Sequence, residues 1–391
     1  MSDSTEDPYG TVRNAVVLVR DGLIDWVGAA SDAPEGVIAS AREDIDLGGG
    51  WVTPGLIDAH THLVFGGTRA GEWERRLGGA SYEDIARAGG GILSTVRATR
   101  SASLDDLVLG ARSRLETMID FGTTTVEIKS GYGLEPEAEL RMLEAARTLG
   151  NTGVSVSTTL LGAHALPPEF QGDRAGYIDL VCDEMIPRAA DGLADAVDAF
   201  CEGIGFTPEE CTRVLEAGAA HGLAGRLHAD QLSDLEGAAL AARMGARSAD
   251  HLEYTNEAGA EAMAAAGCAA VLLPGAFYFL QETRKPPIEA FREYGVPLVV
   301  ATDSNPGSSP TTHPLVAMNQ ACVLFGLTPA EALAGMTRLA GPVLGLDDRG
   351  VIEAGRRADL ACWAVGSPAE LSYWMGGTPA MAVIADGRRL R

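Results

Sequence analysis

Histidine is the residue whose placement in this chain first points to chemistry. Of the seven histidines, five stand at or near the ends of apolar runs, and these are His60, His62, His164, His228 and His251. Imidazole binds transition metals and transfers protons near neutral pH. Because catalytic groups project from the carboxyl ends of parallel strands in barrel enzymes, this placement indicates one shared reaction centre.

Three of these histidines, together with one aspartate, predict a metal site. His60 and His62 in GLIDAHTHLV are two residues apart, so both side chains point to one face of a strand. His228 in RLHADQL and Asp303 in VVATDSNPGSSP also follow apolar runs. Each feature alone is compatible with packed histidines or a turn-forming aspartate. Together, three imidazoles and a carboxylate form a ligand set that leaves a position open for water.

Two further residues are candidates for acid–base chemistry and for anion binding. His251 in SADHLEY is not needed for the metal site and suits proton transfer, although a buried histidine bonded to the backbone is the alternative. Arg69 in the loop FGGTRAGEW is a candidate to bind a substrate carboxylate through paired hydrogen bonds. A solvated surface arginine is the other explanation.

Polar groups also follow the second, third and eighth predicted strands. Tyr132 in KSGYG and His164 in LLGAHAL are placed like Arg69, after apolar runs. The segment 305–310, NPGSSP, offers side-chain and backbone donors beside Asp303. These groups are candidates to surround a small substrate.

Lys129 bears on the number of metal ions, because a carboxylated lysine can bridge two of them. It falls on the second predicted strand, which we expect to lie too far from the fourth strand, where such a bridge is usual. A single ion is therefore favoured, although Cys201 and Glu202 at the end of the fourth strand leave a second site open.

The elements that must position these residues alternate between apolar runs and Ala/Leu/Glu/Arg-rich helical segments, which is typical of βα units around a parallel sheet. Eight strands over about 250 residues close a (β/α)8 barrel. The candidate strands are 55–65, 123–130, 154–164, 196–202, 224–230, 247–254, 268–274 and 296–303.

Both ends of the chain read as short strands with Gly- and Asp-rich turns, as in NAVVLVRDGLIDWVG and PAMAVIADGRRLR. We therefore expect residues 1–54 and 345–391 to form one composite β-sandwich domain beside a barrel of residues 55–344.

Composition excludes several classes of protein. The 391 residues include 54 Asp and Glu against 30 Lys and Arg, a formal net charge of −24. Such a chain lacks the basic surface that binds nucleic acid or anionic membrane. The first ten residues are acidic, and no run of about 18 apolar residues occurs. We expect a soluble cytoplasmic protein whose six scattered cysteines are reduced.

The motifs PGLIDAHTHLVF, RLHADQL, SADHLEY and ATDSNPGSSP resemble the amidohydrolase superfamily. Within it, the loops THLVFGGTRAGEW, TTTVEIKSGYGL and LLGAHALP are similar to those of the family that opens the ring of imidazolone propionate in histidine degradation. The resemblance covers roughly residues 14 to 385. It implies hydrolysis of a ring C–N bond, one zinc or iron ion per chain, an anionic small-molecule substrate and a homodimer.

The resemblance also implies a role for each matching residue. His60, His62, His228 and Asp303 would bind the metal. The substrate would be bound by Arg69, Tyr132, His164 and Gln231, and the ring-opened product, formiminoglutamate, by Asn305, Gly307 and Ser308.

Gln231 departs from some family members, which have Glu at this position in contact with the substrate ring and the metal-bound water. Glutamine cannot act as a general base, so that role shifts toward Asp303 and His251, and Gln231 stays among the catalytic candidates.

Two other readings remain open from the sequence. One is another amidohydrolase, a cyclic amidase or deaminase with a neutral ring substrate, which would not need Arg69. The other is a barrel without metal or activity, against which the intact ligand set argues.

Overall fold

The computed structural model describes residues 7–36, 41–79, 90–377 and 379–391. Its centre is an eight-stranded parallel sheet in which each strand pairs with the next in chain order. The strands are β4 (Leu56–Asp58), β5 (Thr123–Lys129), β6 (Ser155–Ala163), β7 (Ala196–Cys201), β8 (Ala224–Ala229), β9 (Ser248–His251), β10 (Ala269–Leu272) and β11 (Leu298–Val300).

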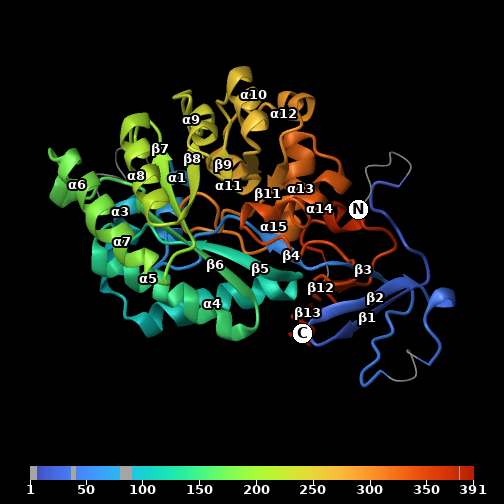
Figure 1. Cartoon of the computed structure of the whole chain (residues 1–391). Coiled ribbons are helices and arrows are strands. Elements are labelled where there is room, and N and C mark those ends of the chain that lie inside the picture. Colours follow the sequence, from blue (N-terminus) through green and yellow to red (C-terminus); the bar gives the residue numbers. More distant parts are fainter. Residues whose placement is uncertain (1–6, 37–40, 80–89, 378) are drawn as a thin grey trace.

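Helices surround this sheet, as Figure 1 shows for α4 and α5 on one side and for α9, α10 and α12 on another. Together the elements form the expected (β/α)8 barrel, so this fold prediction is confirmed. The helices are α1 (Ala70–Leu77), α3 (Ile92–Ser101), α4 (Leu104–Asp120), α5 (Pro136–Leu149), α6 (Arg174–Leu180), α7 (Ile186–Ala190), α8 (Pro208–Ala220), α9 (Gly237–Arg243), α10 (Glu257–Ala266), α11 (Pro274–Leu280), α12 (Ile288–Tyr294), α13 (Pro314–Phe325), α14 (Pro329–Gly335), α15 (Ala340–Val343) and α16 (Glu370–Tyr373).

The first strand is much shorter than the expected 55–65, because the barrel closes between β4 and β11 by a few contacts rather than by a full ladder. A single parallel bridge joins Thr61 to Ser304. The Asp303 N–H donates to the His60 carbonyl, and the His62 N–H donates to the Ser304 carbonyl, both at 3.0 Å. These contacts hold the segment after β4 extended, so His60 and His62 keep their two-residue spacing outside a regular strand.

Segments from both chain ends lie together beside the barrel, at the lower right of Figure 1. β3 (Trp51–Pro54), β12 (Leu360–Trp363), β13 (Ala382–Ala385) and β14 (Arg388–Arg389) form an antiparallel sheet, and β1 (Ala15–Arg20) pairs with β2 (Leu23–Ala29). Asp21 and Gly22 connect β1 to β2 with φ values of 50° and 83°. Two positive φ angles are typical of the tight hairpin turn that Asp-Gly favours.

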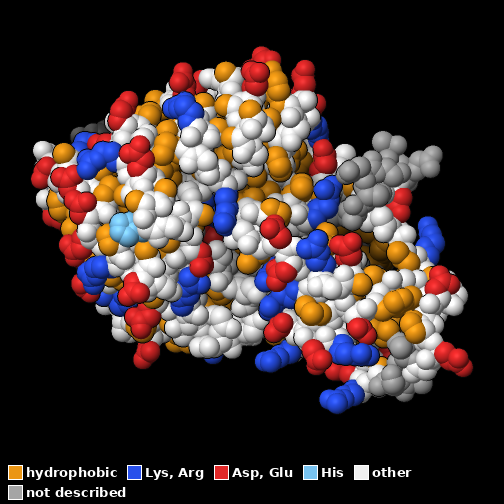
Figure 2. Space-filling model, viewed as in Figure 1, with side chains coloured by type: hydrophobic (Ala, Val, Ile, Leu, Met, Phe, Trp, Pro, Cys, Tyr) orange, Lys and Arg blue, Asp and Glu red, His pale blue; other side chains and the backbone are white. Residues whose placement is uncertain are grey.

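The acidic surface is partly neutralised by neighbouring arginines. Figure 2 shows red and blue side chains next to one another over much of the visible face. Arg188 lies 2.8 Å from Glu137, and Arg147 lies 2.8 Å from Asp195. Such exposed pairs contribute about 0–1 kcal/mol each, so the fold depends on its buried groups. Within the described residues, no helix combines the length and apolar character needed to cross a membrane.

Candidate active site

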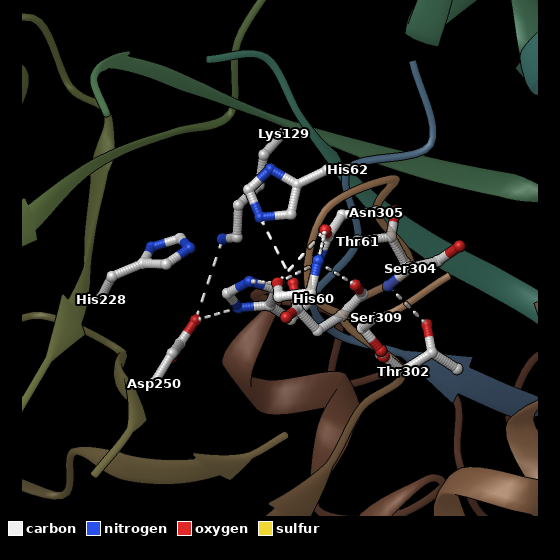
Figure 3. Close-up of polar contacts among 12 residues, drawn as sticks. His60, Thr61, His62, Lys129, His228, Asp250, Thr302, Ser304, Asn305 and Ser309 are labelled. Carbon is white, nitrogen blue, oxygen red and sulfur yellow. Dashed lines mark hydrogen bonds and ion pairs between the residues drawn. The ribbon is translucent and has the colours of Figure 1, made fainter. Parts of the chain in front are cut away.

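Three imidazoles converge at the carboxyl end of the barrel. His60 and His62 follow β4, and His228 lies on β8; Figure 3 shows their rings around one common space. One ring nitrogen from each lies within 4.8 Å of the others. All three side chains are buried. Among the described residues, this is the one group of three or more histidine, cysteine or acidic side chains with metal-ligand spacing.

Asp303 completes this cluster from the opposite side of the barrel closure. Its Oδ1 lies 3.5 Å from the Nε2 atom of His60 and 3.5 Å from that of His62. Two ligands each about 2.0–2.1 Å from a tetrahedral metal ion are separated by roughly 3.4 Å. Asp303 Oδ1 and His60 Nε2 are buried and have no hydrogen-bond partner within the described residues. The three imidazoles therefore form a group with metal-ligand spacing, and the position of Asp303 against two of them suits a fourth ligand.

Two carboxylates orient two of the imidazoles from behind. His60 Nδ1 lies 2.6 Å from Asp250 Oδ2, and His228 Nδ1 lies 2.9 Å from Asp198 Oδ2. The His60 contact is a hydrogen bond, and a ring that donates its Nδ1 proton to a carboxylate keeps the Nε2 lone pair free, which is the tautomer that binds metal through Nε2. Although burial opposes the charged form, His228 and Lys129 hold the pKa of Asp198 well below its usual range.

Lys129 links these carboxylates at the centre of the barrel. Its Nζ lies 2.9 Å from Asp198, 3.0 Å from Glu127 and 3.8 Å from Asp250, and all four side chains are fully buried. Figure 3 shows the amino group directed toward Asp250, between His228 and His62. Despite burial, the nearby carboxylates raise the pKa of Lys129, so it stays charged.

The expectation that Lys129 lies too far from the fourth strand was wrong, because its long side chain spans the barrel interior and reaches Asp198 on β7. At the end of β7, where the sequence left a second metal site open, the Glu202 carboxylate is already hydrogen-bonded to the protein. Glu202 accepts hydrogen bonds from Leu232 N, Ser233 N and Ser233 Oγ at 2.7, 3.1 and 2.6 Å. It holds the loop that carries Gln231.

Arg69 and Gly307 come together although one follows the first barrel strand and the other the eighth. A Cβ atom at Gly307 would collide with the Arg69 guanidinium. A second contact orients Arg69, because its Nε donates a hydrogen bond to the Glu72 carboxylate at 2.9 Å. Its side chain is 22% exposed, so the cation is only partly screened by solvent.

Tyr132 and His164 form a wall beside His62. The ring centroid of His62 lies 5.8 Å from that of Tyr132 and 5.4 Å from that of His164. Tyr132 is 5% exposed. His164 Nδ1 lies 2.9 Å from the Gly131 carbonyl oxygen, so a proton on Nδ1 leaves Nε2 as an acceptor.

The loop of Asn305, Gly307 and Ser308 is internally bonded. Asn305 Oδ1 accepts from the backbone N–H groups of Gly307 and Ser308, both at 2.8 Å. Asn305 Nδ2 donates to the Asp303 carbonyl oxygen at 2.7 Å. These bonds fix the loop beside Asp303, with Arg69 against it.

His251 and Asp303 occupy constrained backbone positions. Their φ angles are 82° and 50°, values that are uncommon for side-chain-bearing residues and that concentrate at functional sites. The His251 ring centroid lies 5.4 Å from that of His228, and its Nδ1 is buried without a hydrogen bond within the described residues. Burial lowers the pKa of His251 well below its usual value, whereas burial raises the pKa of Asp303 to about 7.

The sequence reading missed Glu127, Asp198 and Asp250. A signal was present, because each is an acidic residue within a strand whose residues are nearly all buried. Such residues are rarely buried unless they are paired.

A separate cavity of about 680 Å³ lies at the amino ends of the strands, lined among others by Arg147, Arg247 and Arg349, and contains none of the predicted site residues.

Comparison with known proteins gives consistent matches over nearly the whole chain. The amidohydrolase family model matches residues 51–390. An imidazolonepropionase of Methylobacterium nodulans is 60% identical over 382 residues, 97% of this chain and 94% of that protein. An imidazolonepropionase of Cupriavidus necator is 57% identical over 385 residues, 98% of this chain and 92% of that protein.

The solved structure of an adenosine deaminase from Xanthomonas campestris with bound zinc superposes with a TM-score of 0.68 at 19% identity, covering 98% of this chain and 90% of that one. This similarity supports the fold. The close relatives confirm the resemblance that the motifs indicated.

Replacing His228 by Ala tests the metal site. We expect metal bound after loading and desalting to fall well below one ion per chain, because one of the clustered nitrogens is lost. Elemental analysis measures this. His221→Ala is the matched control, since His221 is exposed at the end of α8 and its Nδ1 contacts the Ala217 carbonyl oxygen. A full metal complement in His228→Ala would contradict the assignment.

Replacing Lys129 by Met tests the carboxylates behind the imidazoles. We expect zinc affinity, measured by competition with a chromogenic chelator, to fall about 10- to 100-fold, as on loss of groups that orient metal ligands. The free energy of unfolding should also fall, because three buried carboxylates lose their cation. Lys285→Met is the control at the chain's other lysine, which is exposed. Unchanged zinc affinity in Lys129→Met would refute this role.

Proposed function

This chain belongs to the amidohydrolase family and, within it, to the imidazolonepropionases, and we therefore propose that it hydrolyses 4-imidazolone-5-propanoate to N-formimidoyl-L-glutamate in histidine degradation. The bond broken is the ring C–N bond of the cyclic amide. The observation that carries the proposal is the Arg69 guanidinium against Gly307, on the loop that follows Asp303. A cation beside a hydrolytic centre suits a ring with a carboxylate tail.

His60, His62, His228 and Asp303 would hold one metal ion, zinc or iron. When bound, such an ion lowers the pKa of water toward neutrality and polarises a carbonyl oxygen. The orphaned, buried Nε2 of His60 and Oδ1 of Asp303 support this assignment.

Arg69, Tyr132 and His164 would bind the substrate. Arg69 pairs with the propionate and fixes the ring relative to the imidazoles, which converts binding energy into orientation. The Tyr132 hydroxyl and the Nε2 acceptor of His164 would bond to the polar edge of the ring. Asn305, Gly307 and Ser308 would contact the ring-opened product from the loop beside Arg69.

The remaining groups move protons. Water adds to the ring carbonyl carbon, the bond from this carbon to the ring nitrogen breaks, and the nitrogen takes a proton, so one water is consumed per ring opened. Asp303 takes the proton from water at its carboxylate. His251 assists transfer to the departing nitrogen, and Gln231 orients the ring by hydrogen bonding, since an amide does not act as a base.

Cell location and assembly are part of the same proposal. The described cysteines are all free, as suits a reducing cytoplasm. On the family resemblance, the protein would form a homodimer.

The function is tested by following the imidazolone absorbance after the metal-loaded protein is added. We expect the band to disappear and N-formimidoyl-L-glutamate to accumulate. An analogue without the propionate should react far more slowly. Equal rates on both compounds would favour an amidohydrolase for neutral rings, and no reaction with either would refute the proposal.

Replacing Arg69 by Met should lower kcat/KM by an amount equivalent to about 2–4 kcal/mol, because a charge-assisted pair with the substrate is lost. Metal content should stay at the wild-type value. Arg75→Met, at an exposed arginine on α1, should behave as wild type. If Arg69→Met retains wild-type kcat/KM, another residue binds the propionate.

Replacing His251 by Asn should leave metal content and folding intact and lower kcat by about 10² to 10⁴, the usual contribution of acid–base assistance. KM should change less. Steady-state kinetics and elemental analysis on the same preparation check both. Loss of metal together with activity would identify His251 as a ligand, whereas full activity would make it a structural histidine.

A further inference from the structure

A buried carboxylate outside the reaction centre holds the loop that carries Tyr132. Glu139 lies on α5, and its side chain is fully buried. Its Oε2 accepts from Gly131 N at 2.9 Å, and its Oε1 accepts from Gly133 N and Leu134 N, both at 2.7 Å. Three backbone donors on one carboxylate are a strong, directional restraint.

The loop conformation depends on such a restraint. Gly131 and Leu134 have φ angles of 104° and 53°, both in the left-handed region. A Cβ at Gly131 would lie 2.9 Å from His164 Nδ1, and a Cβ at Gly133 would collide with the backbone of Ala138 and Glu139. The close approach of loop and helix therefore requires glycine at both positions, and Glu139 satisfies the loop amides that this approach buries.

A second side chain holds the loop by its carbonyl groups. Arg100 on α3 donates from Nε to the Gly133 oxygen at 2.6 Å and from one terminal nitrogen to the Leu134 oxygen at 3.1 Å. The same terminal nitrogen donates to Glu169 at 2.7 Å. The N–H groups of the loop thus face one charged group, and two of its carbonyls face another of opposite sign.

The loop in turn fixes two side chains of the site. Tyr132 is part of it, and the Gly131 carbonyl holds His164 by its Nδ1. The two rings lie 5.5 Å apart, beside His62. Glu139 therefore acts on Tyr132 and His164 indirectly, because it holds the backbone of the loop that positions both side chains.

We propose that Glu139 is a positioning residue for substrate binding, whose carboxylate keeps the 131–134 loop in the conformation that presents Tyr132 and His164 to the imidazolone ring. This inference rests on the proposed function for the identity of the substrate. The clamp, meaning the hydrogen bonds of Glu139 and Arg100 to the 131–134 loop, rests on contacts that involve no substrate.

Glu139→Gln tests the proposal with little change in volume, because the amide nitrogen cannot accept the N–H that it faces. We expect KM to rise about 10- to 100-fold, as for loss of hydrogen bonds to a charged group, while kcat changes less than about threefold. Bound metal should be unchanged. Hydrogen exchange at the amides of residues 131, 133 and 134 should become faster.

Asp359→Asn is the matched control. Asp359 is also a buried carboxylate, and it accepts a hydrogen bond from the Asp386 N–H at 2.7 Å. It lies just before β12, a strand of the antiparallel sheet beside the barrel. We expect it to lower the melting temperature without changing KM. Arg100→Met loosens the same loop from its half-buried side, and should raise KM even if Glu139→Gln does not fold.

The outcomes separate the clamp from the function. Faster exchange in the loop with unchanged KM in Glu139→Gln or Arg100→Met would overturn the positioning role, as would unchanged exchange. Loss of metal in Glu139→Gln would overturn it as well. If the wild-type protein fails to open imidazolone propionate, the proposed function fails, and the exchange measurement still tests the clamp because it needs no substrate.

Discussion

The buried amino group of Lys129 is the interaction on which the reaction centre depends. Three carboxylates, Glu127, Asp198 and Asp250, meet it inside the barrel with no exposure to solvent. Burying a carboxylate without a partner costs several kcal/mol, so these groups persist only as a set. Two of them receive the Nδ1 side of His228 and His60. The charge network around Lys129 thus fixes the orientation of the His60 and His228 rings that would bind the metal.

Substrate recognition uses the same principle at a different place. The loop bearing Tyr132 is bonded to Glu139 and Arg100, which come from two helices. Arg69 rests against Gly307 and is braced by Glu72. Charged neighbours thus hold Arg69 and the loop of Tyr132, so little reorganisation of these groups is needed when the anionic ring binds.

The sequence predicted the eight parallel strands. It also predicted that His60, His62, His228 and Asp303 lie close together, because strand ends in a parallel barrel share one edge. It did not predict where the first strand ends, since the closure at Thr61 and Ser304 is a long-range contact that local pattern does not carry. Nor did it predict the network of Lys129, whose side chain crosses the barrel to Asp198. Strand periodicity specifies the face of a residue, but not how far a flexible side chain reaches across it.

The most direct test of this account is anomalous diffraction at the zinc edge from crystals of the zinc-loaded protein. The account predicts one zinc ion bound by the Nε2 atoms of His60, His62 and His228 and by the Asp303 carboxylate, with Asp250 and Asp198 against the Nδ1 atoms of His60 and His228. Zinc bound instead by Nδ1 atoms, by the carboxylates around Lys129, or by Cys201 and Glu202 would contradict it.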